Sequence, residues 1–182
     1  MRFIPTKIPA VVVIEPDIFE DSRGFFMETW QVNKFTEGGI TANFVQDNHS
    51  RSNQGTLRGL HYQVKQPQGK LIRVLAGKIF DIAVDLRHNS PSFGQWVGEI
   101  ISDENKKMLW IPEGFAHGFY VLSETADFFY KCTDFYNPEC ERTLRWDDPD
   151  LAIDWPLIDG ETPNLAAKDA KGSLFKDAEY FE

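Results

Sequence analysis

The sequence has few cysteines and no run of positive charge. Only two cysteines, Cys132 and Cys140, occur in its 182 residues. A chain of this length can bury a core without covalent cross-links, so these residues indicate reduced thiols rather than a disulfide framework. The formal net charge is -9, and no lysine-rich segment offsets it. This charge disfavours nucleic acid as a partner, whereas a small anion could still bind to a few local cations.

Signals for membranes and for redox cofactors are also missing. The early apolar segment from Ile8 to Ile14 contains Pro9, is shorter than a membrane span, and lacks a following cleavage site of small residues. No dinucleotide-binding glycine fingerprint occurs, so we expect no cofactor. We therefore expect a cytoplasmic protein that forms one domain over residues 1–182 and has no membrane partner.

Helical periodicity is scarce, whereas short apolar segments recur between turns. The strands expected are Val11 to Glu15, Phe25 to Thr29, Phe44 to Ser50, Thr56 to Tyr62, Leu71 to Leu75, Lys78 to Arg87, Trp96 to Ile101, Lys107 to Ile111, Gly118 to Leu122, Ala126 to Cys132 and Arg142 to Trp146. A short helix is expected at Gln31 to Glu37, and a helical turn near Thr162 to Lys168. Strands of this number and spacing predict an all-β sandwich or barrel.

The clearest strand, Lys78 to Arg87, has two different faces. Apolar side chains alternate on one face, namely Phe80, Ile82, Val84 and Leu86. The other face carries Asp81, Ala83 and Asp85. Because side chains alternate across a strand, this segment predicts one apolar face and one face with carboxylates.

Two histidines stand in segments that indicate chemistry. His61 lies in LRGLHYQ and His117 lies in IPEGFAHGF, where the spacing P-x-G-x-x-H resembles the second motif of the cupin double-stranded β-helix. A metal-binding cupin also supplies an H-x-H pair and a following glutamate, but here Gln63 takes the second histidine position. A metal site needs about three protein ligands. We therefore expect no metal, and a metal-dependent cupin enzyme is kept as an alternative.

Without a metal, each candidate side chain has a functional and a structural interpretation. An imidazole titrates near pH ~6.5 and can act as a general base, or it can be buried against a backbone carbonyl. Tyr130 and Tyr136 could be core aromatics, and Arg23 and Arg58 could support a turn or pair with a surface carboxylate. A guanidinium also matches a pyrophosphate in bidentate fashion, which favours a ligand.

Seven segments carry a more specific pattern. They are FEDSRGFFMETW, FVQDNHSRS, LRGLHYQ, QGKLIRVLAGKIFDIAVDLRHNSPSFG, LWIPEGFAHGF, YKCTDFY and DLAIDWP. In order and spacing they resemble the dTDP-4-dehydrorhamnose 3,5-epimerase family, from about Met1 to Asp169. The resemblance implies a cupin double-stranded β-helix, or jelly roll, with short peripheral helices. It also implies a homodimer that exchanges N-terminal strands, for which Val11 to Ile14 is a suitable apolar strand.

The resemblance further implies roles for individual residues. His61 matches the catalytic base, and Asp169 its carboxylate partner. Lys70 matches the cation that stabilises an enolate oxygen, and Tyr130 the general acid on the opposite face of the sugar. The substrate-binding positions implied are Arg23, Glu28, Gln46, Asp47, Asn48, Arg58, His117, Tyr136, Glu141 and Lys168, with Tyr136 stacking on the thymine. Asp81 is either a structural carboxylate or a partner of Lys70.

The expected reaction converts dTDP-4-dehydro-6-deoxy-D-glucose to dTDP-4-dehydro-β-L-rhamnose. The C4 ketone acidifies both C3 and C5, so one group that stabilises the enolate oxygen can serve both carbons. Inversion requires a base and an acid on opposite faces of the ring. Two further alternatives stay open from the sequence: an epimerase that inverts only C3 or only C5, and a non-catalytic module that binds a dTDP-sugar.

Overall fold

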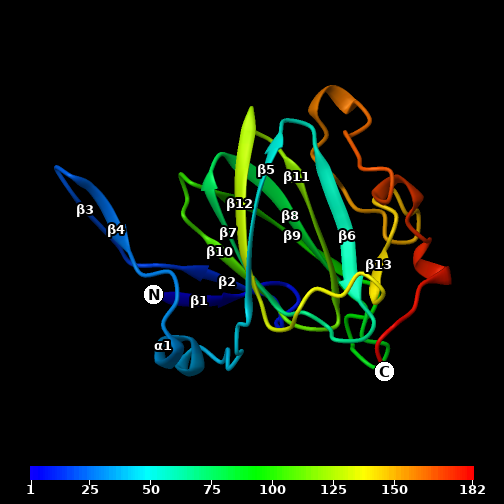
Figure 1. The fold of residues 1–182 in the computed structure, drawn as a ribbon, viewed down its shortest axis with the longest axis horizontal. Helices are drawn as coiled ribbons and strands as arrows, with labels where there is room; N and C mark the ends of the chain where they lie inside the picture. The colour runs from blue at the N-terminus through cyan, green and yellow to red at the C-terminus, as the bar shows by residue number, and fades with distance from the viewer.

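The chain folds mainly into β-strands, and the computed structural model describes every residue from Met1 to Glu182. In chain order the strands are β1 (Arg2–Pro5), β2 (Val12–Glu15), β3 (Ile18–Asp21), β4 (Gly24–Met27), β5 (Gln46–Asn53), β6 (Leu57–Gln63), β7 (Lys70–Ala76), β8 (Lys78–Asp85), β9 (Trp96–Ser102), β10 (Met108–Ile111), β11 (Phe115–Val121), β12 (Thr125–Cys132) and β13 (Glu141–Thr143). A six-stranded sheet has the order β1-β2-β10-β7-β12-β5, and a five-stranded sheet has the order β13-β6-β11-β8-β9. The two antiparallel sheets face each other in a jelly roll (Figure 1), so the predicted fold class is confirmed.

The strands expected from the sequence all overlap observed strands, with ends displaced by at most three residues. β11 begins at Phe115, three residues before the expected start, and His117 therefore lies inside this strand. β1 and β3 were not predicted. Each pairs with only one neighbour and is largely exposed, so neither has the alternating apolar pattern that burial imposes on inner strands.

The two faces of β8 contact different cores. Ile82 packs with the buried cluster that the five-stranded sheet forms with the C-terminal segment. Ala83 belongs to the core between the two sheets. Asp81 and Asp85 lie on the side of Ala83 and have 0% exposure. The predicted alternation is confirmed, and the carboxylate face is turned toward the interior of the barrel.

The helix expected near the N-terminus is confirmed. α1 spans Val32–Glu37, and the side chain of Gln31 caps it by accepting a hydrogen bond from the Lys34 N–H. Phe35 is its buried residue and packs on Trp30 at 4.4 Å between ring centroids. None of the helices has the length and apolar character needed to span a membrane.

The segment after β13 is mostly irregular and covers the outer face of the five-stranded sheet (Figure 1). Its short 3-10 turns are η1 (Ile158–Gly160), η2 (Asp169–Lys171) and η3 (Phe175–Asp177). The helical turn expected near Thr162 to Lys168 lies a few residues later, because the N–H groups of Asp169 and Ala170 donate to the Ala166 carbonyl and the turn continues into η2. Asn164, at the start of the expected range, instead forms a parallel bridge with Thr56.

The hairpin of β3 and β4 projects away from the two sheets (Figure 1). It exposes Phe19, Phe25 and Phe26 at 64%, 56% and 68%. β2, by contrast, is held between β1 and β10 in its own sheet. The apolar strand expected for exchange, Val11 to Ile14, thus pairs with strands of its own chain. The strands that extend outward are β3 and β4.

Candidate active site

A cavity of about 610 Å³ opens between the two sheets, at the side where β5, β6, β7, β11 and β12 meet the C-terminal segment. Most of the residues proposed from the sequence line this cavity. They are Gln46, Asn48, Arg58, His61, Lys70, His117, Tyr130, Tyr136, Glu141, Lys168 and Asp169. The structure therefore brings together side chains from six strands, the loop before β13 and the C-terminal segment. Arg23, Glu28, Asp47 and Asp81 do not line the cavity.

His61 forms a pair with Asp169. Its Nε2 atom lies 2.7 Å from Oδ1 of the carboxylate, and Asp169 is 1% exposed. The C-terminal segment delivers Asp169 because Ser173 bridges Leu144 beside β13. Gly172 allows this close approach, since a Cβ atom there would lie 2.7 Å from the carbonyl carbon of Leu144. A buried carboxylate at this distance orients the ring and stabilises its charged form.

A β-bulge places Arg58 and His61 in the same cavity. The residues are three apart, so a regular strand would send them to opposite faces. In the pairing of β6 with β11, His61 is opposite His117 and Arg58 is opposite Phe119, which leaves one extra residue in β6. Gly59 within the bulge has a φ of 114°, and a Cβ atom there would lie 2.6 Å from the His117 carbonyl oxygen.

His117 forms a second histidine–carboxylate pair, with Asp81. Nε2 of the ring lies 3.1 and 3.0 Å from the two carboxylate oxygens. The His117 ring also stacks on Phe128 at 5.9 Å between centroids. Burial raises the pKa of Asp81, and the nearby His117 and Lys70 oppose that rise. The hydrogen-bond partner of Asp81 is thus His117, rather than the Lys70 suggested by the sequence.

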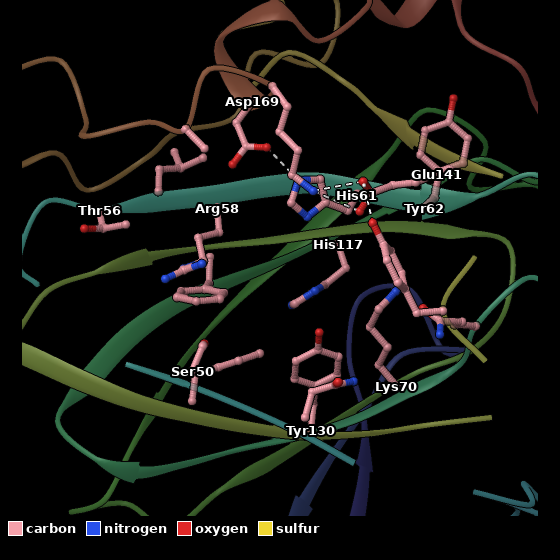
Figure 2. Close-up of a pocket in the computed structure, with 18 of the residues that line it drawn as sticks. Ser50, Thr56, Arg58, His61, Tyr62, Lys70, His117, Tyr130, Glu141 and Asp169 are labelled. Carbon is pink, nitrogen blue, oxygen red and sulfur yellow. Dashed lines mark hydrogen bonds and ion pairs between the residues drawn. The ribbon is translucent and has the colours of Figure 1, made fainter. Parts of the chain in front are cut away.

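Lys70 and Tyr130 stand on the opposite wall, in the six-stranded sheet. Figure 2 shows Tyr130 with its phenol oxygen directed toward His61 and His117, and Lys70 beside it. Lys70 is 7% exposed, and this burial lowers the pKa of its ammonium group. Burial also raises the pKa of Tyr130 to about 12, so the phenol stays protonated well above neutral pH.

The rim of the cavity is a network of polar side chains. The ammonium group of Lys168 donates to both Glu141 oxygens at 3.0 and 2.9 Å. The hydroxyl of Tyr136 donates to Glu141 at 3.3 Å, and its backbone N–H donates to Gln46 at 2.9 Å. Gln46 in turn donates to Asn48. Half of the Tyr136 side chain is open to a ligand, since its exposure is 50%.

Three predicted site residues that lie outside the cavity are held elsewhere by their strand position or by an ion pair. Asp47 lies between Gln46 and Asn48, so the alternation of β5 turns it outward, where it accepts from Lys131 at 2.7 Å. Arg23 is on the projecting hairpin, with its side chain 88% exposed and paired with Asp21. Glu28 follows the hairpin and pairs with Lys34 at 2.8 Å.

Several lining residues were not identified from the sequence, namely Ser50, Thr56, Gln63 and Asn164. Ser50 had a usable signal, because it shares the parity of Gln46 and Asn48 on one expected strand. Asn164 had none, since its position depends on the bridge to Thr56. The structure contains no group of three or more His, Cys, Asp or Glu side chains placed to hold a metal ion.

The fold and the site together define a class: a jelly-roll enzyme of the cupin type. The imidazoles, the phenol and the ammonium group that line its cavity can move protons on a small ligand. The chain belongs to the dTDP-4-dehydrorhamnose 3,5-epimerase family, because the sequence model of that family matches residues 5–177. It is therefore an isomerase of nucleotide sugars in dTDP-rhamnose biosynthesis.

Individual relatives match this chain over nearly its full length. The dTDP-4-dehydrorhamnose 3,5-epimerase of Pseudomonas aeruginosa is 58% identical over 182 residues, which are 100% of this chain and 99% of the relative. The crystal structure of a dTDP-6-deoxy-D-glucose-3,5-epimerase from Legionella pneumophila, in complex with dTDP-4-keto-L-rhamnose, is 57% identical and has a TM-score of 0.94. That match covers 98% of this chain and 94% of the other. A 3,5-epimerase from Elizabethkingia anophelis is 47% identical over 99% of both chains, with a TM-score of 0.93.

Proposed function

We propose that this chain inverts C3 and C5 of dTDP-4-dehydro-6-deoxy-D-glucose with one set of groups. His61 removes a proton from one face of the sugar, and Tyr130 donates a proton to the other face. Lys70 stabilises the oxygen of the enolate that forms between the two steps. The observation that supports this most directly is the position of His61 and Tyr130 on opposite walls of one cavity, with Lys70 beside the phenol (Figure 2).

Each step has a group of suitable chemistry. When His61 accepts the carbon-bound proton it becomes an imidazolium ion, which the buried carboxylate of Asp169 stabilises. The electron pair of the broken C–H bond moves to the C4 oxygen, where a preorganised ammonium group lowers the energy of the charge. The enolate carbon then takes the phenol proton of Tyr130. The His61 imidazolium ion releases its proton to solvent, and solvent reprotonates the phenolate. With a pKa of about 12, Tyr130 is protonated and ready to donate at neutral pH.

The rim residues are suited to the nucleotide part of the substrate. We assign the thymine to Tyr136, whose half-exposed ring offers a stacking surface, with Gln46 and Asn48 as amide partners. Arg58 and Lys168 supply the positive charge for the pyrophosphate. Glu141 holds the ammonium group of Lys168 in place.

The fate of the hydrogens tests this function directly. In heavy water the wild-type enzyme should introduce deuterium at both C3 and C5 of the product, because each inversion replaces a substrate hydrogen with one from solvent. Proton NMR of the sugar during turnover measures both positions. Label at one carbon alone would indicate an epimerase of one centre, and no label with tight dTDP binding would indicate a binding module.

We also propose that the active form is a homodimer in which the β3–β4 hairpin of one protomer reaches the cavity of its partner. Three exposed phenylalanines on an outstretched hairpin are unfavourable in water, and a second copy could cover them. This arrangement also gives Arg23 and Glu28 access to a substrate, although neither lines the cavity of its own chain.

Subunit complementation tests the dimer. The variants Arg23→Ala and His61→Asn should each be weakly active, but their mixture after co-expression should regain activity. In a mixed dimer one cavity combines an intact His61 with an intact Arg23 from the partner subunit. Light scattering should give the mass of two chains. A mixture no more active than its separate components would contradict the exchange.

A cytoplasmic location is the remaining proposal. It is supported by the two cysteines, which are both buried and unpaired, as expected in a reducing compartment. Cell fractionation that recovers the chain outside the cytoplasm would contradict it.

A further inference from the structure

One buried group in the site has no part in the mechanism described so far. Asp81 is 0% exposed and lies behind the cavity wall, where it accepts hydrogen bonds from Nε2 of His117. His117 is directly opposite His61 in the pairing of β6 with β11. The site therefore contains two histidine–carboxylate pairs next to each other, and only the pair of His61 and Asp169 has a proton to transfer.

We propose that Asp81 is a positioning residue, which fixes the ring of His117 and supplies the buried negative charge that keeps the ammonium group of Lys70 protonated. This inference rests on the proposed function, in which Lys70 acts as a cation. Asp81 holds both of its oxygens 3.0 to 3.1 Å from one ring nitrogen, so His117 is held from behind while its ring lines the cavity. A carboxylate placed in this way selects one tautomer and one orientation of the ring.

The groups that surround Lys70 affect the charge of its side chain. An ammonium group that is 7% exposed loses most of its hydration, so a nearby negative charge favours its protonated form. The candidates near it are Cys132, Asp81, Glu141 and Glu113. Glu113 is exposed, so solvent screens its charge.

Two of the other candidates, Cys132 and Glu141, are also weak counter-charges for Lys70. Burial raises the pKa of the Cys132 thiol, which therefore stays neutral near pH 7. Glu141 is already paired with Lys168. Asp81 is thus the one carboxylate near Lys70 that is fully buried, and its hydrogen-bond partner is the His117 ring, which lines the same cavity as Lys70. Burial acts against charge on both Asp81 and Lys70, but their mutual attraction favours the state in which both are ionised.

The substitution Asp81→Asn separates charge from shape. The amide oxygen of the replacement can still accept a hydrogen bond from His117, but the negative charge is gone. We expect the pKa of Lys70 to fall by about 1 unit or more. The alkaline limb of kcat/KM should move to lower pH by the same amount, because a neutral amine cannot stabilise the enolate. The matched control is Glu113→Gln, which removes an exposed carboxylate near the same lysine and should leave both values unchanged.

The pKa of Lys70 can be followed without turnover. NMR of protein labelled with ¹³C and ¹⁵N at the lysine side chains gives the titration of Lys70, which the variant Lys70→Arg assigns. Thermal melts and dTDP affinity verify that Asp81→Asn is folded. If it is not, the double variant Lys70→Met/Asp81→Asn should be more stable than Lys70→Met alone, because the latter leaves a buried carboxylate without its counter-charge.

The outcomes distinguish a failure of the role of Asp81 from a failure of the proposed function. An unchanged titration of Lys70 in folded Asp81→Asn would overturn the role of Asp81, whatever the rate. The same holds if the double variant is no more stable than Lys70→Met. A lowered pKa with an unchanged pH profile would support the charge coupling and contradict the part of the proposed function that assigns the enolate oxygen to Lys70.

Discussion

The variant His61→Asn is expected to lower kcat by about 10²- to 10⁴-fold, the usual contribution of a general base. Asparagine fits within the space of the ring, but it cannot accept a carbon-bound proton at neutral pH. The variant should bind dTDP with nearly wild-type affinity, since the rim residues are unchanged. Steady-state turnover and calorimetry with dTDP measure the two quantities.

The deuterium experiment sharpens this prediction. In heavy water the His61→Asn variant should introduce no label at either C3 or C5, because one base is proposed to serve both carbons. The matched control is His88→Asn, since His88 lies outside the cavity against Phe93 and Tyr180. Label that persists at one carbon would mean that a second base, such as His117, acts there.

The variant Tyr130→Phe is expected to separate exchange from inversion. Phenylalanine keeps the ring that packs at 5.2 Å on Phe128, so the cavity should keep its shape. His61 can still remove a proton and return one to the same face, so substrate hydrogens should exchange with solvent while the configuration is retained. Inversion should fall by about 10²- to 10⁴-fold, because no acid stands on the other face.

Two measurements on one sample test whether Tyr130→Phe separates hydrogen exchange from inversion. NMR gives the label that enters recovered substrate, and the yield of the inverted sugar gives the rate of epimerisation. Tyr180→Phe is the control, because the Tyr180 hydroxyl lies outside the cavity and donates to the carbonyl of Phe175. Inversion by Tyr130→Phe near the wild-type rate would remove Tyr130 from its role and require another acid.

The alternation of apolar and polar residues in the sequence was sufficient to predict most of the strands. Residues 78–85 alternate because one face contacts an apolar cluster and the other faces the interior of the barrel, and that alternation is visible without coordinates. The same periodicity could have corrected one expectation. Gln46, Asp47 and Asn48 are consecutive in a strand, so all three cannot point into one cavity, and Asp47 is the one turned away.

Other features depend on contacts that are remote in the sequence. Asp169 reaches His61 across 108 positions, because the C-terminal segment folds back along β13. The partner of Asp81 is His117 because β8 and β11 are adjacent in the sheet, and strand order is not written in local periodicity.

The sequence by itself determined the all-β class, the inward and outward faces of the strands, and the family, since these follow from residue types and short spacings. Only the tertiary structure decided that Asp81 joins His117, that a bulge turns Arg58 and His61 to the same side, and that Arg23 extends away from its own cavity. The physical reason is that side-chain alternation is a local property of the backbone, whereas a binding site depends on distances between strands that only packing fixes.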